Sequence, residues 1–517
     1  GRDRALSAAL VLGAFALRAW DVAGQSLWSD EDITLDRSAL SLGALWRELP
    51  VEHGALYFAL LRGWTRLAGD GDLVLRLPSV LAGTVVVALA LALGRRMVGA
   101  RGAWFAAAAA ALSPFLTSYS QEARMYALLA AIGLGALAAA ERAASSRRWA
   151  WPAAGALAAL AIHTHLFGAL LIPILAVLAA GDVLGRWSPS GRVAKDRAAR
   201  RATARGWLLA AVTAAALLSP IAPRLAALAG AGEALAGREW LVEGAEAEAG
   251  AAGTAAAAPA AAVRLIAAWA AQTVVTAGRP PSTGERLATA LLAAAAAVGA
   301  VALARAAARR DRAGRRAALA LAWVAVPLLA GTALAVLGVA IHPRYLILGA
   351  PALLVAAGAG IARLPSRAAL AAGTGVVAVV ALPLADWFGD PAARKRDYRA
   401  LVAQVDVTTH GRDSVLLLDG PSMGLAKRYL PPDSPLKLEN LRSETNVDRD
   451  AAGFDARLQE LARRRPNVWL ATDGAASTGA RDWLAAHLHA MGSTGVQDVT
   501  LRRYASAADG GVPLPVA

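Results

Sequence analysis

Long apolar runs, separated by short basic clusters, recur along the first 385 residues of this 517-residue chain. Each run approaches the ~20 residues that an α-helix needs to cross about 30 Å of hydrocarbon. The chain is 57% hydrophobic and 18% charged, whereas soluble domains are roughly 45–50% apolar and about 25% charged. A single soluble core and a disordered chain are both excluded, so the sequence predicts a polytopic membrane protein. The runs lie near 5–20, 77–94, 102–118, 124–141, 149–163, 164–181, 206–222, 287–304, 317–340, 344–362 and 367–385.

Basic residues fill the connections between alternate runs, and they account for much of the formal net charge of +15. In membrane proteins such residues gather on the cytoplasmic side, so this charge does not indicate nucleic acid. All the clusters fall on one side if the amphiphilic segment 53–67, which contains Arg62 and Arg66, does not cross the membrane. The clusters are Arg95–Arg101, Arg142–Arg148, Arg186–Arg205, Arg305–Arg316 and Arg363–Arg367.

This topology places the unusual polar residues together on the extracytoplasmic side. The segments concerned are 21–76, 118–124, 163–165, 223–286, 342–344 and everything after about 386. We therefore expect any chemistry at that face, and little beyond arginine in the cytoplasmic loops.

The composition changes near Trp387, where strand-like and helix-like segments begin to alternate. The pattern predicts a membrane domain over 1–386, with outer loops 21–76 and 223–286, and an extracytoplasmic α/β domain over 387–517. We expect strands at 414–419, 467–471 and 497–504, and helices at 456–465 and 481–491. The sequence has no P-loop and no GxGxxG pattern, so nothing marks a nucleotide site. The alanine-rich stretch 245–262 is of low complexity, and we expect it to be poorly ordered.

Acidic residues crowd the first outer loop, in the string Trp28-Ser29-Asp30-Glu31-Asp32. Acids at a membrane face are costly unless they are hydrated, paired or used. They form either a solvated cap or a site in which one carboxylate is a general base. His53, further along, is either a helix cap or a site residue, and Arg76 is either an interfacial anchor or a substrate ligand.

A second polar cluster, SYSQEARMY at 118–126, separates two apolar runs. Either it is a hairpin with solvated Glu122 and Arg124, or its many hydrogen-bonding groups serve a site. His163 and His165 in the next outer turn are candidate metal ligands without a clear third partner. Arg344 and Tyr345 open a later span, where the arginine either snorkels or binds a phosphate.

These strings resemble a known family when they are taken in order. WSDED, EHGALYFALLRGW, LRLPS, SYSQEARMYAL and HPRYLILGAP are similar to the bacterial family 39 glycosyltransferases. These are relatives of the protein O-mannosyltransferases and aminoarabinose transferases of the GT-C superfamily. The similarity covers the layout of residues 1–385 and is strongest over 20–130.

The resemblance implies an inner-membrane enzyme that moves a sugar, with inversion, from a polyprenyl-phosphate donor to an acceptor on the outer face. It implies that Asp30 is the base, with Glu31 beside it and Glu122 as the acid of the second turn. Arg124 and Arg344, with Tyr345, match positions near the donor phosphate. His53 falls in an HPP-type motif, but Gly54 and Ala55 replace its prolines.

We therefore expect an all-α membrane domain of about 11–13 transmembrane helices followed by a small α/β domain. The expected partners are a polyprenyl-phosphate-linked sugar, membrane lipid, and a glycan, glycolipid or protein acceptor, with no nucleic acid. No cofactor is certain, although a divalent metal held by Asp30, Glu31 and Glu122 is left open. The absence of cysteine removes disulfides and thiol chemistry.

Two other functions fit the same topology. A transporter or lipid flippase would couple intramembrane acids to ions, but here the acids lie in outer loops and no inverted repeat is visible. A non-catalytic assembly or sensor protein would act through its C-terminal domain.

Overall fold

A computed structural model describes most of the chain, in two compact units. The first unit contains Gly1–Val22 and Leu40–Gly389, and the second contains Ala23–Ala39 and Asp390–Ala517. The described residues are 1–49, 53–143, 148–187, 197–230, 283–336, 343–390, 395–409, 414–418, 423–440, 451–465, 467–472, 478–496 and 499–505. The alanine-rich stretch 245–262 lies outside them.

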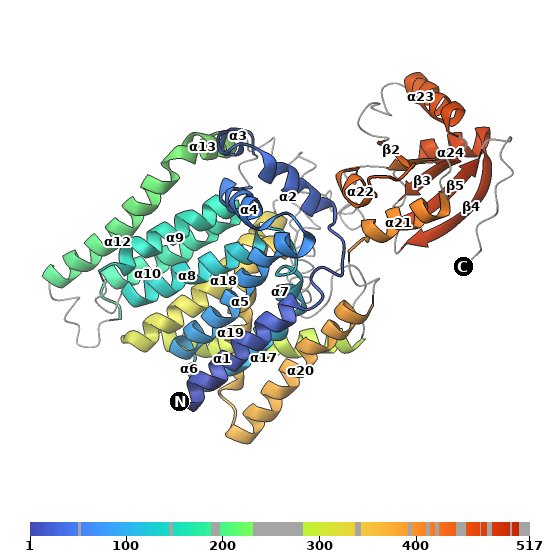
Figure 1. Ribbon diagram of the computed structural model, residues 1–517. Coiled ribbons are helices and arrows are strands. Elements are labelled where there is room, and N and C mark those ends of the chain that lie inside the picture. Colours follow the sequence, from blue (N-terminus) through green and yellow to red (C-terminus); the bar gives the residue numbers. More distant parts are fainter. Residues whose placement is uncertain are drawn as a thin grey trace. The chain divides into compact units, whose positions relative to one another are not determined.

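The first unit is a bundle of long helices (Figure 1). The described residues of every apolar run are largely helical, and eight helices among the described residues are long and apolar enough to cross a membrane. The all-α membrane domain is thereby confirmed. The long helices are α1 (Arg2–Ala19), α5 (Asp72–Met97), α6 (Gly99–Leu112), α8 (Tyr126–Ala143), α9 (Ala150–Thr164), α10 (Leu171–Val183), α12 (Arg197–Leu218), α17 (Thr283–Ala307), α18 (Arg312–Val336), α19 (Ala350–Ile361) and α20 (Ser366–Gly389).

Short helical pieces connect the long helices of this unit. The predicted run 102–118 breaks at Ser113, whose side chain accepts a hydrogen bond from the N–H of Leu116 and starts a new helix before Pro114. The pieces are α3 (Leu42–Glu48), α4 (Ala55–Ala68), α7 (Pro114–Ser118), η1 (Leu166–Leu170), η2 (Ser219–Ile221), α13 (Ala222–Gly230) and η5 (Pro343–Gly349).

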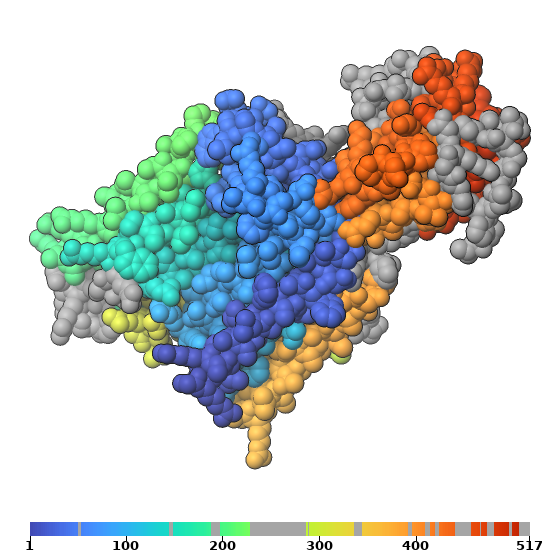
Figure 2. All heavy atoms as spheres, in the orientation of Figure 1, coloured from blue at the N-terminus to red at the C-terminus, as the bar shows by residue number. Residues whose placement is uncertain are grey.

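Large apolar side chains cover the outside of the bundle, as expected of a surface that faces lipid. Leu12 on α1 and Leu370 on α20 are 66% and 64% exposed. Both helices lie on the face shown in Figure 2, α1 in dark blue and α20 in light orange. Inside the bundle, alanine and glycine allow close helix contact. Gly358 of α19, for example, packs against the backbone of Gly102 on α6.

Ion pairs gather at one end of the bundle, where the basic clusters meet. Arg96 and Arg316 both bind Glu141, at the end of α8. Arg315 donates from Nε to Asp182 at 2.8 Å and from Nη2 to the carbonyl of Ala140 at 3.1 Å. The segregation of charge that the sequence predicts is therefore present in the packed bundle.

Helix α4 does not run across the bundle. Its first residues follow Gly54, which packs against the backbone of His163 at the end of α9. Near its other end, Trp64 donates from Nε1 to the carbonyl of Val74 at 2.7 Å, at the start of α5. The end of α9 and the start of α5 both lie away from the ion pairs, so both ends of α4 lie on that side, as the charge pattern predicts.

The second unit contains a five-stranded mixed sheet in the order β2-β1-β3-β5-β4. Strands β1, β2 and β3 are parallel, and β5 runs antiparallel to β3 and β4. The strands are β1 (Ser414–Leu418), β2 (Lys437–Asn440), β3 (Asn467–Thr472), β4 (His489–Val496) and β5 (Val499–Ala505), and the helices are α2 (Ser29–Ala39), α21 (Tyr398–Thr409), α22 (Met423–Tyr429), α23 (Ala451–Arg464) and α24 (Thr478–His487).

Alternate residues of β1 pack on opposite faces of this sheet, because successive side chains of a strand point to opposite sides. Leu416 and Leu418 join a core with α21 and α22, whereas Val415 and Leu417 join a core with α23 and α24. The small α/β domain that the sequence predicts is thus confirmed as a layered structure with helices on both faces.

Two details of the second unit differ from the sequence prediction. The helix expected over 481–491 ends at His487, and Met491 lies in β4, paired antiparallel with β5. The segment Ala23–Ala39 of the first outer loop clusters with this unit, which begins again at Asp390. Apolar periodicity does not reveal either feature, because both depend on pairing with distant segments.

Candidate functional site

Buried polar residues gather at the end of the bundle opposite the ion pairs. The turn 119–125 leads into α8, and there Glu122 and Arg124 are 4% exposed each. The N–H of Arg124 donates to the carbonyl of Glu122 at 2.8 Å. The two candidate site residues of this turn are therefore held together in a tight backbone bend.

The rest of this turn fixes it to the bundle. Gln121 donates from Nε2 to the carbonyls of Arg18 and Trp20 at 3.1 and 2.9 Å, and its Oε1 accepts from Trp387 Nε1 at 2.8 Å. Ser79 of α5 donates to the carbonyl of Arg124 at 3.2 Å. Some polar side chains of the SYSQEARMY string therefore hold the turn in place. A solvated hairpin, the other alternative, would not need these buried hydrogen bonds.

Arg124 and Arg344 lie 220 residues apart in the chain, and they meet at one aromatic ring. Their guanidinium carbons lie 5.8 and 5.7 Å from the ring centroid of Tyr126, within the range of cation–π contacts. Arg344 also lies 5.6 Å from the ring of its neighbour Tyr345. The structure thus brings together three of the predicted site residues, Arg124, Arg344 and Tyr345.

Aromatic rings complete this group. The ring of His165 lies 5.4 Å from that of Tyr345 and 5.9 Å from that of Tyr126, and Phe167 stacks on Tyr345 at 5.2 Å. The predicted residue His53 joins at the edge, with its ring 5.9 Å from that of His165. We call Arg124, Tyr126, His165, Arg344 and Tyr345 the arginine–aromatic cluster.

His165 in this cluster is neutral at physiological pH. It precedes the candidate span Leu166–Val183. Burial, followed by the charges of Arg124 and Arg344, lowers its pKa to about 3. Its Nδ1 accepts a hydrogen bond from the N–H of Phe167 at 3.2 Å, so the neutral ring carries its proton on Nε2 and acts as a donor. Sequence reasoning had considered His165 only as a metal ligand.

Two predicted residues have structural partners. Arg76 is 2% exposed and donates from Nη1 to the carbonyl of Val22 at 2.7 Å, so it fixes the chain just before the acidic segment. His53 is followed by Gly54, where an added Cβ would lie 1.8 Å from the carbonyl oxygen of His163. Glycine, rather than proline, therefore follows His53 because the backbone of His163 leaves no room for a side chain at position 54.

Asp30 and Glu31 lie in the first turn of α2, in the second unit. Glu31 accepts a hydrogen bond at Oε2 from the N–H of Trp28 at 3.2 Å, as in the capping box that closes a helix N-terminus. A solvated cap was one alternative for these acids; Glu31 does have a capping role, but it is buried, as are Asp30 and Asp32. That Asp30, Glu122 and Arg344 share one pocket at the outer face stays a prediction.

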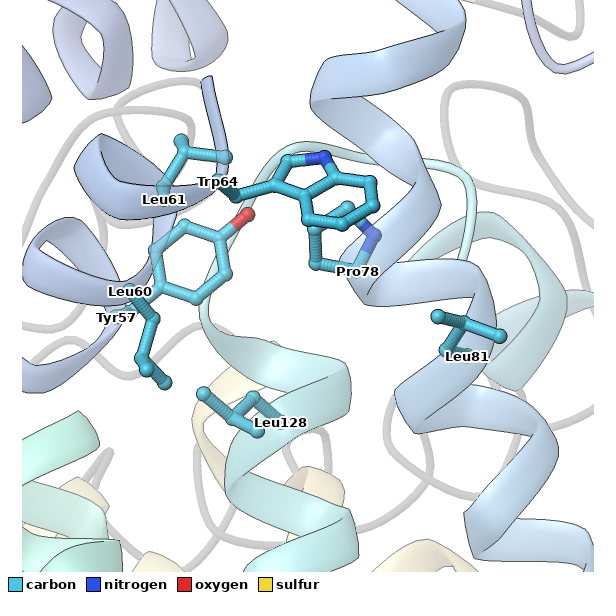
Figure 3. Close-up of a pocket in the computed structure, with 7 residues that line it drawn as sticks. All are labelled: Tyr57, Leu60, Leu61, Trp64, Pro78, Leu81 and Leu128. Atoms are coloured by element: carbon cyan, nitrogen blue, oxygen red, sulfur yellow. The ribbon is translucent and has the colours of Figure 1, made fainter. Parts of the chain in front are cut away.

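An apolar groove opens beside the cluster, between α4, α5 and α8. Its volume is about 260 Å³, and Leu60 and Leu81 at its rim are about half exposed. The hydroxyl of Tyr57 lies 3.4 Å from Ser79 Oγ, the group that supports Arg124. Figure 3 shows the lining side chains, which are Tyr57, Leu60, Leu61, Trp64, Pro78, Leu81 and Leu128.

The metal that the sequence left open has no preformed site in the described part of the chain. There, no three histidine, aspartate or glutamate side chains gather in a way that would hold a cation. His163, one of the two histidines of the outer turn, has its Nε2 2.8 Å from the carbonyl of Leu217. A divalent metal stays an untested expectation.

Part of the helical unit matches a known protein family. Residues 52–191 match the model of the dolichyl-phosphate-mannose-protein mannosyltransferase family. No curated protein matches the chain in sequence.

The fold is shared with the solved structures of two other proteins. The apo crystal structure of ArnT from Cupriavidus metallidurans covers 97% of this chain and 98% of its own, with 14% identity and a TM-score of 0.57. The same protein bound to undecaprenyl phosphate covers 99% of each chain, with 15% identity and a TM-score of 0.53. The Archaeoglobus fulgidus oligosaccharyltransferase, in complex with zinc and sulfate, covers 90% of this chain and 67% of its own, with 12% identity and a TM-score of 0.51. The shared fold and the family match over residues 52–191 agree with the family resemblance that the motifs indicated.

Proposed function

We propose that this chain, which has a GT-C fold and the mannosyltransferase pattern over residues 52–191, is an inverting glycosyltransferase. It takes a sugar from a polyprenyl phosphate and transfers it to an acceptor hydroxyl on the extracytoplasmic face of the bacterial cytoplasmic membrane. The observation that carries the proposal is the convergence of Arg124 and Arg344 on Tyr126, at the end of the bundle opposite the basic clusters.

Two guanidinium groups in a largely buried setting suit a lipid phosphate. Arginine presents planar donors that bind phosphate oxygens bidentately, and such charge-assisted bonds are strong. A phosphate placed at Tyr126 would be within reach of two guanidinium groups at once, because Arg124 and Arg344 both lie against this ring. The aromatic rings of Tyr126 and Tyr345 offer a surface on which the first sugar or isoprenoid carbons would pack.

The hydrocarbon part of such a donor requires apolar surface. The groove beside Tyr57 and Leu81 is lined by apolar side chains and lies close to Ser79, which supports Arg124. ArnT of Cupriavidus metallidurans has been crystallised with undecaprenyl phosphate, a lipid of the class we assign here as the carrier.

Transfer in this proposal is a single displacement. Asp30 takes the proton of the acceptor hydroxyl, whose oxygen attacks the anomeric carbon while the bond from that carbon to the phosphate oxygen breaks. The polyprenyl phosphate leaves with both electrons, and Arg124 and Arg344 stabilise its charge. General-base assistance of this kind typically contributes about 10²–10⁴-fold. Glu122 is the second candidate acid and lies two residues from Arg124.

Sugar transfer by the purified full chain tests this function. Lipid-linked sugars that accumulate in cells lacking the gene, identified by mass spectrometry, supply the donor for the assay. We expect Asp30→Asn to abolish transfer, whereas the control Asp3→Asn, at an exposed acid of α1, should leave it unchanged. Wild-type turnover by Asp30→Asn would refute the base assignment. A reconstituted activity that depends on an ion gradient would favour a transporter instead.

A further inference from the structure

The acidic segment, residues 23–39, is joined to the α/β domain although about 370 residues separate them in the chain. The N–H of Tyr398 donates to Ser26 Oγ at 2.9 Å, and Gln25 Nε2 donates to the carbonyl of Lys395 at 3.1 Å. The N–H of Leu27 donates to the hydroxyl of Tyr429, at the end of α22, at 2.8 Å. The residues just before α2 are therefore bound by the domain's own backbone and side chains.

Cationic side chains of the domain reinforce this junction. The Nζ of Lys395 lies 3.3 Å from the ring centroid of Trp28, which directly precedes α2. Arg399 donates to the carbonyl of Ala23, and its guanidinium carbon lies 5.1 Å from the ring of Tyr429. A junction that joins apolar, polar and cationic contacts fixes orientation as well as position.

Asp32 makes the closest contact between α2 and the domain. Its carboxylate accepts a hydrogen bond from the N–H of Leu425, in the first turn of α22. A Cβ at Gly424 would lie 2.4 and 2.5 Å from the two carboxylate oxygens of Asp32. A side chain at position 424 would therefore force the Asp32 carboxylate to shift from its present place against α22.

Helix geometry separates the roles of the two aspartates. At about 100° per residue, Asp30 and Asp32 lie roughly 200° apart around the axis of α2. The side that carries Asp32 docks on α22, so Asp30 projects on the other side.

We propose that the α/β domain is the element that positions the candidate base, with Asp32, Gly424 and Tyr429 as its joint. This inference rests on the proposed function, because it gives the domain a task in the same reaction. Asp32, Gly424 and Tyr429 are positioning residues, which hold α2 so that Asp30 is presented at a constant angle. A displacement of about 1 Å in such a group costs on the order of 10²-fold in rate.

The test uses the full-length protein in detergent and three glycine or aspartate variants. Gly424→Ala should displace Asp32 and lower kcat by on the order of 100-fold, with KM for the lipid donor within about twofold. Gly424→Ala combined with Asp32→Ala removes the collision and should recover part of kcat. The matched control is Gly495→Ala in β4, where an added Cβ meets nothing within 4 Å, and it should behave as wild type.

Hydrogen exchange of these proteins and of Tyr429→Phe gives a readout independent of activity. We expect Gly424→Ala and Tyr429→Phe to speed exchange over Ser29–Ala39 while the strands β1 and β3 stay protected. Wild-type kcat in Gly424→Ala, or unchanged exchange in α2, would overturn the inference. Faster exchange throughout the sheet would do so too, because the loss would then be unfolding. If wild-type protein transfers no sugar, the proposed function fails, and exchange alone then decides whether the domain holds α2.

Discussion

At the scale of single residues, neighbouring side chains of one type have different roles here. Glu31 closes the first turn of α2, and Asp32 contacts Gly424 and Leu425. The same holds for arginine, since Arg76 binds the carbonyl of Val22 whereas Arg124 and Arg344 converge on Tyr126. Residue type alone does not distinguish these roles, because each depends on the groups that the fold places opposite.

Arg344→Lys tests whether planar, bidentate recognition matters at the cluster. Lysine keeps the charge but cannot form two parallel hydrogen bonds to one phosphate. We therefore expect KM for the lipid substrate to rise about tenfold in Arg344→Lys, and to rise further in Arg344→Ala. Steady-state kinetics with varied donor measures this. Arg363, at the opposite end of the bundle, is the control, and Arg363→Lys should change nothing. Equal KM values for all the variants would rule out a phosphate role for Arg344.

Gly54→Ala should lower stability. The added methyl would lie 1.8 Å from the carbonyl oxygen of His163, so the start of α4 must move away from α9, and overpacking typically costs about 1–3 kcal/mol. Thermal unfolding in detergent measures the loss. Gly63→Ala in the same helix, where an added Cβ meets nothing within 4 Å, should be neutral. An unchanged midpoint for Gly54→Ala would contradict the close contact.

Asp32 makes the docking of α2 depend on pH. Burial, followed by the charge of Asp36, raises its pKa from 3.8 to about 6, against the hydrogen bond from Leu425 and the charge of Arg428. Because the folded pKa is the higher one, this group's stabilising contribution is full below about pH 3.8 and is lost as pH rises through 6. Asp32→Asn should remove this dependence.

The stability difference between Asp32→Asn and wild type should therefore grow in favour of the variant between pH 5 and pH 7.5. Midpoints of thermal unfolding at the two pH values measure it. A difference that stays constant, or that shrinks, would show that Asp32 does not titrate in this range.

At the scale of elements, the two ends of the long helices separate the ion pairs from the candidate site. α5 and α8 carry an arginine or glutamate at one end and a site residue at the other. Arg96 and Glu141 form an ion pair, while Arg76 lies near the start of α5 and Tyr126 begins α8. Since α5 has 26 residues and α8 has 18, several helical turns separate the charged end of each helix from its other end.

Arg315→Ala should destabilise the bundle strongly. Both partners of the ion pair between Arg315 and Asp182 are largely buried, and removing one partner of a buried pair costs about 3–5 kcal/mol. Denaturant unfolding followed by tryptophan fluorescence measures the loss. Arg309→Ala breaks a pair with Asp311 that is largely exposed, and it should cost less than about 1 kcal/mol. Similar losses for both variants would mean that the buried pair contributes no more to the free energy of unfolding than the exposed pair.

At the scale of the whole molecule, the sidedness of the chain follows from its charge. Basic residues gather at one end of the bundle, and under the positive-inside rule we expect this end to face the cytoplasm. The chain leaves the last long helix, α20, at Gly389, so we expect the α/β domain outside the cytoplasm.

A single cysteine in the cysteine-free chain tests this topology. Val407→Cys, at a residue of α21 that is 69% exposed, should react in intact cells with a thiol reagent that does not cross membranes. Arg309→Cys, at the basic end of the bundle, should react only after lysis. The reverse pattern would invert the topology and remove the extracytoplasmic site.

The sequence by itself determined the helical spans, the segregation of basic residues, the α/β domain and the strings that indicate a sugar transferase. These properties are local, since hydropathy, charge and strand periodicity are each read from a short continuous stretch of the sequence. The tertiary structure decided that Tyr126 and His165 join Arg124 and Arg344. It decided as well that α2 belongs with strands that begin more than 370 residues after it. It also decided that β4 replaces the end of a predicted helix. Such contacts depend on complementary surfaces that meet only when the chain packs, and no local pattern encodes them.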